Sequence, residues 1–376
     1  MRRIVIVIVI GLVVIAGTFA IAELTQPSTA DTPGTKVATP APTDPPESRT
    51  TTTTTIITTT LPPRRGNGQP VTFEFGGDVH FEGGLRSKLD SDPAGMFSPI
   101  APELSAADVS MVNLETAITE RGSPVSKEFT FRAPARAFEA LRVAGVDVVT
   151  MANNHGVDYG PVGLQDTLAA KAGTTLGVVG IGANAIEAYA PWKTVVRGQR
   201  ISVIGASDVI DDTVITAWTA TDAQGGIASA KGVQQQRLID SVQAARADSD
   251  TVVVYLHWGA EGMECPTPRQ EELAGALGEA GADIVVGSHA HRVQSAGRLG
   301  TAFVDYGLGN FAFYNESGLS GVTGVLAVTA TGRDIDGYAW KPARIQNNIP
   351  HLLTGTAAAS DVASFTNRRT CTNLTP

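Results

Sequence analysis

The chain has 376 residues, and its 28 Lys and Arg against 37 Asp and Glu give a formal net charge of −9. No block of basic residues follows Arg65, so the sequence lacks the positively charged surface that nucleic-acid binding requires. We therefore expect no nucleic acid among its partners. The length would allow more than one domain of about 100–200 residues, but the composition changes along the chain and the folded part must be smaller.

The N-terminus begins with a basic pair and an apolar run. Arg2 and Arg3 precede residues 4–22, which are almost entirely aliphatic and close to the ~20 residues that a membrane-spanning helix needs. We expect residues 1–22 to form a signal anchor that crosses the cell membrane once, with the globular part outside the cytoplasm. The alternative is secretion after signal cleavage near Ala22, because residues 20–22 resemble a small-residue cleavage site.

Residues 23–70 are rich in Thr and Pro, including a Thr tract at residues 50–60, and contain few large apolar side chains. Such a segment cannot bury a core. We expect an extended, disordered linker that holds the folded part away from the membrane, either O-glycosylated or serving only as length.

From Val71 onward, β-branched strand patterns alternate with helical patterns. Strands are predicted at residues 71–75, 109–113, 146–151 and 175–179, with helices between them near residues 97–107, 135–144 and 163–172. A hairpin follows at residues 193–205, and then a helix at 231–247, a strand at 251–257, a helix at 269–280 and a strand at 283–286. This alternation indicates an α/β fold.

The last predicted strands, residues 302–306, 321–330 and 335–340, have no helices between them, so we expect a second sheet with antiparallel members. We place the globular domain at residues 71–346 and expect residues 347–376 to be a loosely packed tail. Cys265 and Cys371 are the only cysteines. In an exported chain they would form one disulfide or remain two free thiols, and the sequence leaves both open.

Most of the histidines lie in short segments that follow predicted strands. They are His80, His155, His257, His289 and His291. The carboxyl ends of strands are where α/β folds place ligand sites, so we expect one metal centre assembled from loops that are far apart in the sequence.

Each segment alone also has an ordinary explanation. Asp78 and His80 suit Mn, Fe or Zn, but an Asp-x-His pair also occurs in solvated loops. Glu115 either bridges two cations or lies at a helix start. Asn154, beside His155, either offers a neutral amide ligand or forms a turn. His155 would then be free for acid–base chemistry.

Asp158 either orients the ring of His155 or caps the next helix. A lone histidine at the position of His257 would usually be a buried core residue. His289 and His291, two apart after a Gly, are the strongest local signal. Together the segments offer a ligand set that suits two metals sharing one bridging carboxylate: Asp78, His80, Glu115, Asn154, His257, His289 and His291.

The order Asp-x-His, acidic loop, Asn-His, His, Gly-x-His-x-His resembles the calcineurin-like metallophosphoesterases. Within that superfamily, several motifs resemble the CapA family, which is named for poly-γ-glutamate capsule synthesis. They are Asn-Leu-Glu at 113–115, Ala-Asn-Asn-His at 152–155 with Asp-Tyr-Gly at 158–160, His-Trp-Gly at 257–259, Gly-Ser-His-Ala-His at 287–291 and Tyr-Gly-Leu-Gly-Asn-Phe at 306–311. The resemblance runs from about Val71 to Ala330 and implies a four-layer α/β/β/α sandwich with two mixed sheets.

The resemblance also implies roles for the site residues. Asp78, His80 and His291 would hold one metal, and Asn154, His257 and His289 the other. Glu115 would bridge the two, and His155 would be the general acid. The chain departs from the wider superfamily in having Asn-Leu-Glu where a Gly-Asp loop is usual, and from many CapA proteins in having a histidine at position 80.

We therefore expect an exported, membrane-anchored protein with two divalent metal ions, Mn, Fe or Zn. It would act as a metal-dependent hydrolase or transferase on an anionic envelope polymer or a phosphoester, with membrane-bound polymer synthases as partners. The alternative is a non-catalytic factor that binds the polymer for assembly or export and whose metals are structural. A catalytic metal site keeps an open coordination position, whereas a structural site is closed.

Overall fold

The computed structural model describes residues 63–211 and 213–376. The expected anchor at residues 1–22 and most of the expected linker lie outside the described residues. Within the described part of the chain, no helix combines the length and the apolar character that a membrane crossing needs.

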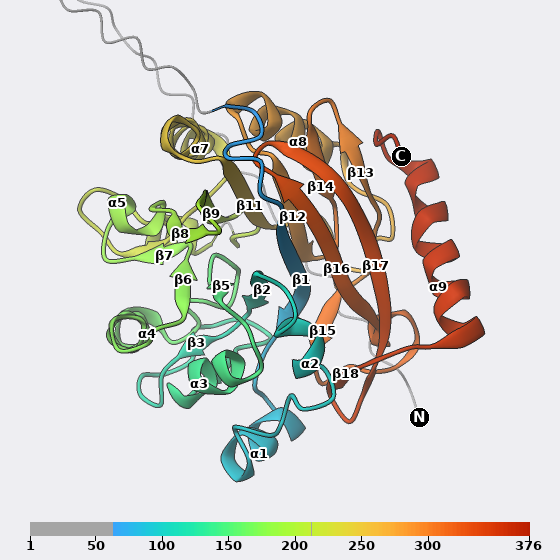
Figure 1. The fold of residues 1–376 in the computed structure, drawn as a ribbon. Helices are drawn as coiled ribbons and strands as arrows, with labels where there is room; N and C mark the ends of the chain where they lie inside the picture. The colour runs from blue at the N-terminus through green and yellow to red at the C-terminus, as the bar shows by residue number, and fades with distance from the viewer. Residues whose placement is uncertain (1–62, 212) are drawn as a thin grey trace, which may run out of the picture. The chain divides into compact units, whose positions relative to one another are not determined.

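Two mixed sheets form the centre of the domain (Figure 1). The larger has the order β18-β17-β16-β1-β2-β5-β6, and β15 pairs with β1 at one end. Its strands are β1 (Val71–Val79), β2 (Val109–Leu114), β5 (Val148–Thr150), β6 (Gly177–Val179), β15 (Asn310–Ala312), β16 (Val322–Thr331), β17 (Asp334–Gln346) and β18 (Ile349–Leu352). In this sheet β1, β2, β5 and β6 run parallel to one another, whereas β16, β17 and β18 are antiparallel to their neighbours.

The second sheet has the order β13-β14-β12-β11-β9-β8. Its strands are β8 (Trp192–Val196), β9 (Gln199–Ser207), β11 (Thr251–Trp258), β12 (Ile284–His289), β13 (Ala296–Leu299) and β14 (Ala302–Asp305). The four central strands are parallel, and the edge strands β8 and β13 are antiparallel. Two small two-stranded sheets accompany them, β3 (Ala117–Ile118) with β4 (Arg132–Ala133) and β7 (Ile181–Gly182) with β10 (Gly226–Ile227).

Alternating side chains on the strands separate the layers. On β5, Val148 joins the core between the two sheets, and Val149 joins the core under the helices of the first sheet. On β11, Val253 faces the core between the sheets, whereas Val254 packs under the helices of the second sheet. Because strand side chains point alternately to the two faces, both sheets are buried on both sides. The expected four-layer α/β/β/α sandwich with two mixed sheets is confirmed.

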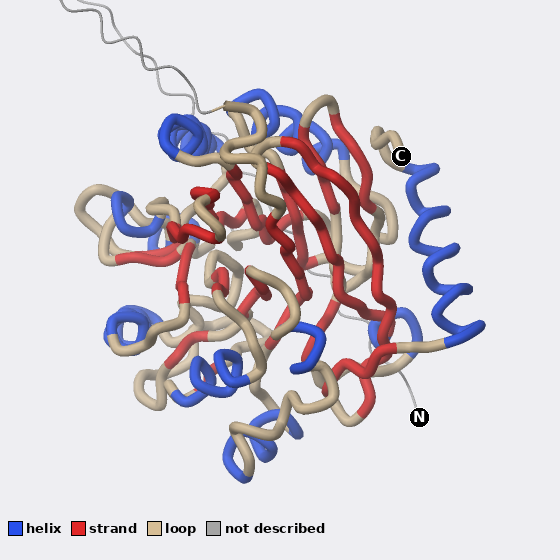
Figure 2. The backbone as a smooth tube through the Cα atoms, viewed as in Figure 1, coloured by secondary structure: helices blue, strands red, loops and turns tan. Residues whose placement is uncertain are grey.

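The helices lie at the periphery of the strands (Figure 2). The first sheet is covered by α1 (Gly84–Ser91), α2 (Ala101–Leu104), α3 (Arg136–Val143) and α4 (Gly160–Ala172), and the second by α7 (Gln235–Asp248) and α8 (Pro268–Ala280). Shorter elements are α5 (Ala185–Ala188), α6 (Ile215–Trp218) and the 3-10 turns η1 (Gly232–Gln234), η2 (Gly318–Gly321) and η3 (Arg368–Cys371). A capping box between Thr267 and Gln270 begins α8, and Gly281 ends it in the left-handed region with φ 114°.

The C-terminal strands differ from the sequence-based expectation. We expected the last three predicted strands to belong to the second sheet. β14, the first of them, does, but β16 pairs with β1, so β16, β17 and β18 extend the first sheet. Antiparallel strands need no helical crossover. The absence of helices therefore predicts that these strands are antiparallel, but it does not predict the sheet that they join.

The expected loosely packed tail is wrong, because residues 347–376 are built into the domain. They form β18 and α9 (Gly355–Asn367), which lies beside β17 (Figure 1). Phe365 of α9 stacks on Trp340 with the ring centroids 4.8 Å apart, and Cys371 forms a disulfide with Cys265. Phe365 is the only buried residue of this helix, so the sequence shows no apolar stripe that would predict it.

The last part of the expected linker, residues 63–70, also contacts the domain. Arg65 pairs with Asp334 at 3.1 Å, and the Gln199 side chain donates to the carbonyl oxygens of Arg65 and Gln69. These contacts are polar, so the apolar pattern of the sequence does not reveal them.

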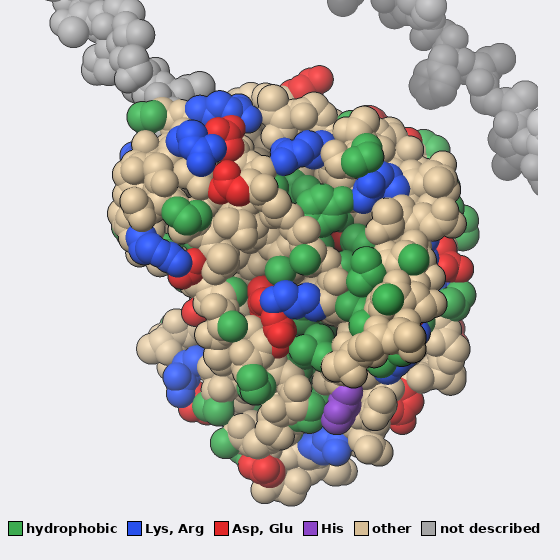
Figure 3. Space-filling model, turned by 45° about the vertical axis from the view of Figure 1, so that its right-hand side comes forward, with side chains coloured by type: hydrophobic (Ala, Val, Ile, Leu, Met, Phe, Trp, Pro, Cys, Tyr) green, Lys and Arg blue, Asp and Glu red, His purple; other side chains and the backbone are tan. Residues whose placement is uncertain are grey.

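Lys and Arg side chains are interspersed with Asp and Glu on the face of the domain shown in Figure 3. That face carries no broad area of one charge sign.

Candidate metal centre

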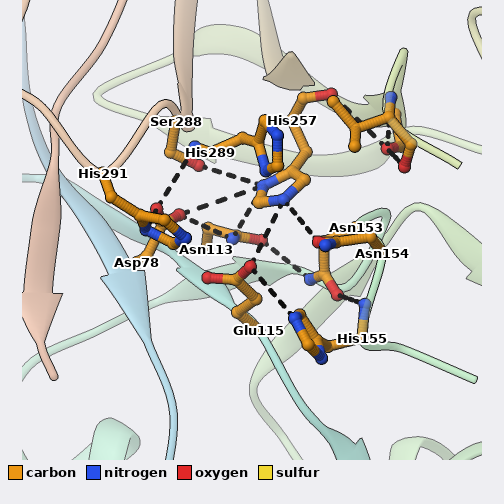
Figure 4. Close-up of polar contacts among 12 residues, drawn as sticks. Asp78, Asn113, Glu115, Asn153, Asn154, His155, His257, Ser288, His289 and His291 are labelled. Atoms are coloured by element: carbon orange, nitrogen blue, oxygen red, sulfur yellow. Dashed lines mark hydrogen bonds and ion pairs between the residues drawn. The ribbon is translucent and has the colours of Figure 1, made fainter. Parts of the chain in front are cut away.

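The candidate site residues meet where parallel strands of both sheets end. Asp78 lies near the end of β1, Glu115 follows β2, and Asn154 and His155 follow β5. From the second sheet, His257 lies near the end of β11 and His289 ends β12. Figure 4 shows these side chains converging from the two sheets on one place. The expectation that the carboxyl ends of strands build the site fits this arrangement.

Asp78 is fixed at the centre of this group. Asn113 Nδ2 donates to Asp78 Oδ1 at 2.8 Å, and the backbone N–H of His289 donates to Oδ2 at 3.2 Å. Next to Asp78, the backbone of Gly77 packs against that of Gly309. Only a glycine fits there, because a Cβ at residue 77 would lie 1.8 Å from the carbonyl oxygen of Gly309. Burial alone would raise the pKa of Asp78, but the hydrogen bond with His291 and the nearby histidine rings hold this pKa well below its usual range.

His289 and His291 both have positive φ angles, 93° and 51°. Residues other than Gly seldom adopt this region, and such strained backbone is concentrated at functional sites. Burial and the rings of His257 and His291 lower the pKa of His289 well below its usual value. Burial also opposes the charged form of His291, but Asp78 and Glu115 outweigh it and raise the pKa of His291 to about 9.

Among the site residues, Glu115 gives the strongest indication of a bound cation. Its side chain is fully buried, and neither carboxylate oxygen has a hydrogen-bond partner in the described structure. Its Oε1 lies 3.4 Å from His257 Nε2 and 3.8 Å from His155 Nε2. Burying an ionised carboxylate that has no hydrogen-bond partner costs on the order of several kcal/mol, and a bound cation would offset that cost. The buried Nδ1 of His289 also has no hydrogen-bond partner among the described residues.

These donors fit divalent cations. In each of two groups, one ligand atom per residue lies within 4.8 Å of the others: Glu115 with His257 and His289, and Asp78 with Glu115 and His291. Glu115 belongs to both groups, which is the position of a bridging carboxylate. The mixture of imidazole and carboxylate ligands suits Mn, Fe or Zn.

Asn154 lies next to the first of these groups. Its Oδ1 is 2.8 Å from His257 Nε2, so the amide oxygen faces the same space as Glu115.

The structure does not bring His80 into either group. Its Nδ1 lies 3.0 Å from the backbone N of Glu82, and its Nε2 lies 3.2 Å from the backbone N of Tyr314. The ring packs among aromatic side chains, with its centroid 4.7 Å from that of Phe131. β1 ends at Val79, so His80 lies in the loop that follows the strand. Burial, helped by the rings of His155 and His291, lowers the pKa of His80 to about 3.

His155 is held by Asp158. The two side chains are 2.6 Å apart through Nδ1 and Oδ2, and Asp158 also accepts from Lys127 Nζ at 2.9 Å and from the backbone N–H of Phe131 at 2.7 Å. The Phe131 ring stacks on the imidazole at 4.0 Å. Asp158 makes no capping bond to α4, whose N-cap is Tyr159. Of the two roles left open by the sequence, Asp158 therefore has the orienting one.

Several residues of the site were missed in the sequence. Asn153 donates to Asn113 Oδ1 at 2.9 Å and accepts from the backbone N–H of His155 at 3.0 Å, so an amide network supports the ligand loops. Glu261 forms a third candidate group with His289 and His291. Lys127 gives no signal in the sequence, because it contacts Asp158 from an irregular segment.

A cavity of about 390 Å³ opens beside this centre. It is lined by Phe129, Phe131, His155, Glu261, Gly262, His291, Arg292, Asn310, Phe313, Tyr314, Asn315 and Ser320. A molecule in the cavity would contact the candidate ligand His291 and the oriented ring of His155 together.

Residues 72–315 match the family model described as bacterial capsule synthesis protein PGA_cap. A capsule biosynthesis protein CapA from Bacillus anthracis is 32% identical over 222 residues, which are 58% of this chain and 53% of that protein. A PGA biosynthesis protein CapA from Bacillus subtilis is 31% identical over 221 residues, covering 58% of this chain and 56% of that protein. The chain spans about half the length of the curated relatives it matches.

A crystal structure of a hypothetical protein from Thermus thermophilus covers 73% of this chain and 99% of its own, with 17% identity and a TM-score of 0.47. The family match extends over more than half of the chain and contains every candidate site residue, so this chain belongs to the bacterial capsule synthesis protein family PGA_cap.

Proposed function

We propose that this chain is a metal-dependent hydrolase or transferase that acts on an anionic cell-envelope polymer of the γ-glutamyl type. The observation that carries the proposal is Glu115, a fully buried carboxylate that two candidate ligand groups share and whose two oxygens lack hydrogen-bond partners among the described residues. An oriented His155 and an open cavity lie beside it.

In this proposal the ligands divide into two sets around Glu115. Asp78 and His291 hold one ion, and Asn154, His257 and His289 hold the other. His80 is outside both sets because its ring nitrogens face backbone amides. When bound, divalent ions supply positive charge that stabilises the negative charge developing on a carbonyl or phosphoryl group.

His155 transfers a proton to the leaving group. Asp158 holds Nδ1 and fixes the ring, so Nε2 is the nitrogen that faces the centre. Stacking on Phe131 keeps the imidazole plane in place. Asp158 positions the acid and does not itself touch the substrate.

The names of the two Bacillus relatives, capsule biosynthesis and PGA biosynthesis, support the choice of polymer. We further propose that residues 1–22 anchor the protein in the cell membrane with the domain outside, near membrane-bound polymer synthases. Support for this placement comes from the apolar run that follows Arg2 and Arg3.

One observation favours a second candidate, a non-catalytic factor that binds the polymer for assembly or export. Asp78, Glu115 and His257 are fully buried, and structural metal sites are closed whereas catalytic ones keep an open position. In this alternative the ions hold the two sheets together and the cavity binds the polymer without reaction.

An activity comparison separates the two candidates. Full-length protein loaded with Mn, Zn or Fe is assayed against γ-glutamyl oligomers, phosphodiesters and phosphomonoesters, with Glu115→Gln as the matched variant. We expect turnover of the γ-glutamyl oligomers by the parent and its loss in the variant. A metal-loaded protein that binds the oligomers and turns over none of the three substrate classes would be an assembly factor.

A further inference from the structure

Arg292 stands out in the wall of the cavity beside the metal centre. Among the described residues that line the cavity, it is the only Arg or Lys. Its Nη1 donates to the carbonyl oxygen of His291 and to Ser320 Oγ, both at 2.8 Å. Its Nε is buried without a hydrogen-bond partner, and the guanidinium makes no ion pair with any carboxylate in the described part of the chain.

A short chain of contacts ties this guanidinium to the candidate ligand His291. Asn310 Oδ1 lies 2.8 Å from His291 Nδ1, and Asn310 Nδ2 donates to the carbonyl oxygen of Ser320 at 3.0 Å. Asn310 and Ser320 are both buried. Arg292 is therefore held at a fixed place relative to the metal centre before any ligand arrives, which lowers the entropy cost of binding.

Nη1 is occupied by these two contacts and Nε is closed off from solvent, so Nη2 is the nitrogen left to meet a ligand. Nη2 makes no hydrogen bond with the described residues. A guanidinium N–H donates a charge-assisted hydrogen bond to a carboxylate or phosphate oxygen.

We propose that Arg292 binds the free carboxylate of a γ-glutamyl unit through its Nη2 and so fixes the polymer at the metal centre. This inference rests on the proposed function, which it deepens by naming the residue that recognises the substrate. Arg292 is then a specificity-determining residue, separate from the metal ligands and from the proton donor.

The rest of the cavity fits a carboxylate on a partly apolar chain better than a phosphate chain. Phe129 and Tyr314 line it with side chains 53% and 42% exposed, which gives methylene groups an aromatic surface to contact. Glu261 is exposed and also lines the cavity, and its carboxylate belongs to a candidate cation group with His289 and His291. The chain has a net charge of −9, so a local cation such as Arg292, in addition to bound metal ions, would favour the approach of a polyanion.

The test measures binding and does not depend on turnover. Metal-loaded full-length protein is titrated with a γ-glutamyl oligomer of defined length by calorimetry, and metal content is measured on the same samples. Arg292→Gln is expected to raise the Kd about tenfold or more. Arg292→Lys should lie between, because an ammonium keeps the positive charge but on a more flexible side chain.

Arg237→Gln is the matched control, because Arg237 is on α7 and pairs at 2.9 Å with Asp222 away from the cavity. It should bind like the parent, and all variants should keep the parent's metal content. The inference is overturned if the Kd of Arg292→Gln lies within about twofold of the control, if the parent does not bind the oligomer, or if it prefers a glycerol-phosphate oligomer of equal charge. If Arg292-dependent binding occurs without turnover, the inference stands and the catalytic proposal alone fails.

Discussion

Asn154 and His155 are neighbours in the chain but take different positions in the site. The Asn154 amide oxygen faces His257 Nε2 at 2.8 Å, whereas the His155 ring turns to Asp158. One short loop after β5 therefore offers a candidate ligand and a candidate proton donor at the same time.

Substitution should separate these two roles. We predict that His155→Ala keeps the parent's metal content while turnover falls by about 10²–10⁴-fold, the usual contribution of a general acid. Asn154→Ala and His289→Ala should lose metal and turnover together. Elemental analysis and initial rates on the same preparations measure both, and His351→Ala, on β18, is the control. Equal loss of metal in His155→Ala and His289→Ala would make His155 a ligand.

His80 offers the opposite test, because the motif suggests a ligand and the structure places its ring among aromatic side chains. We predict that His80→Phe, which keeps an aromatic ring in that space, retains the parent's metal content. His291→Phe should lose metal, since His291 lies 3.3 Å from Asp78 Oδ2 within a candidate group. A drop of about one ion per chain in His80→Phe would return His80 to the ligand set.

The sequence predicts these candidate ligands well because they directly follow apolar runs that form parallel strands. Their supporting residues are harder to predict. Asn113 and Lys127 act through contacts with side chains that are distant in sequence, Asp78 and Asp158, and nothing near them in the chain marks those partners. The position of His80 could not be predicted because it depends on where β1 stops.

A charge cluster around the buried Glu74 joins β1, α2 and β17. Glu74 pairs with Lys341 at 2.6 Å, and Lys341 also contacts Glu103. Burial raises the pKa of Glu74 to about 7, since the opposing effect of Lys341 is smaller and Glu103 adds repulsion. The folded state therefore binds this proton more tightly than the unfolded state does.

This pKa has a defined effect on stability. The contribution of Glu74 is fully present below about pH 4.5 and is lost as the pH rises through about 7. We predict that Glu74→Gln reduces the fall in unfolding free energy between pH 5 and pH 8, where one proton contributes at most about 1.4 kcal/mol per pH unit. Urea unfolding at each pH measures this free energy. The exposed Glu279→Gln on α8 should follow the parent, and a Glu74→Gln curve parallel to the parent would contradict the account.

The predictability of elements follows from how each one buries its side chains. β11 and β12 are buried throughout because both faces are covered, and their runs of Val and Ile predict strands directly. α9 buries only Phe365, so it gives no periodic signal. β16 joins the first sheet because it pairs with β1, and the residues near β16 in the sequence do not determine that partner.

The whole molecule brings the two sheets together at the site. Asp78, Glu115 and Asn154 come from loops and ends of the first sheet, and His257 and His289 from the second. The core between the sheets, with Phe75 from β1 and Tyr255 from β11, therefore fixes the distances between ligands. The alternation of elements predicts this layered architecture, but only the packed structure shows which strand ends face each other.

The expected orientation in the membrane is a property of the full chain. We predict that protease added to intact cells releases the globular domain by cutting in the Thr- and Pro-rich linker, because Arg2 and Arg3 flank the apolar run on the inner side. Immunoblotting of the supernatant detects the released domain. Full protection in intact cells, with cleavage of the same linker after lysis, would contradict this orientation.

We propose that strand ends from both sheets build one centre for two metal ions around Glu115. The most direct measurement is the metal content of folded full-length protein after incubation with Mn, Zn and Fe and removal of excess ions. We predict about two ions per chain for the parent and a clear loss in Glu115→Gln, whose amide cannot supply the bridging charge. A parent protein that stays metal-free while circular dichroism shows it folded would contradict the claim.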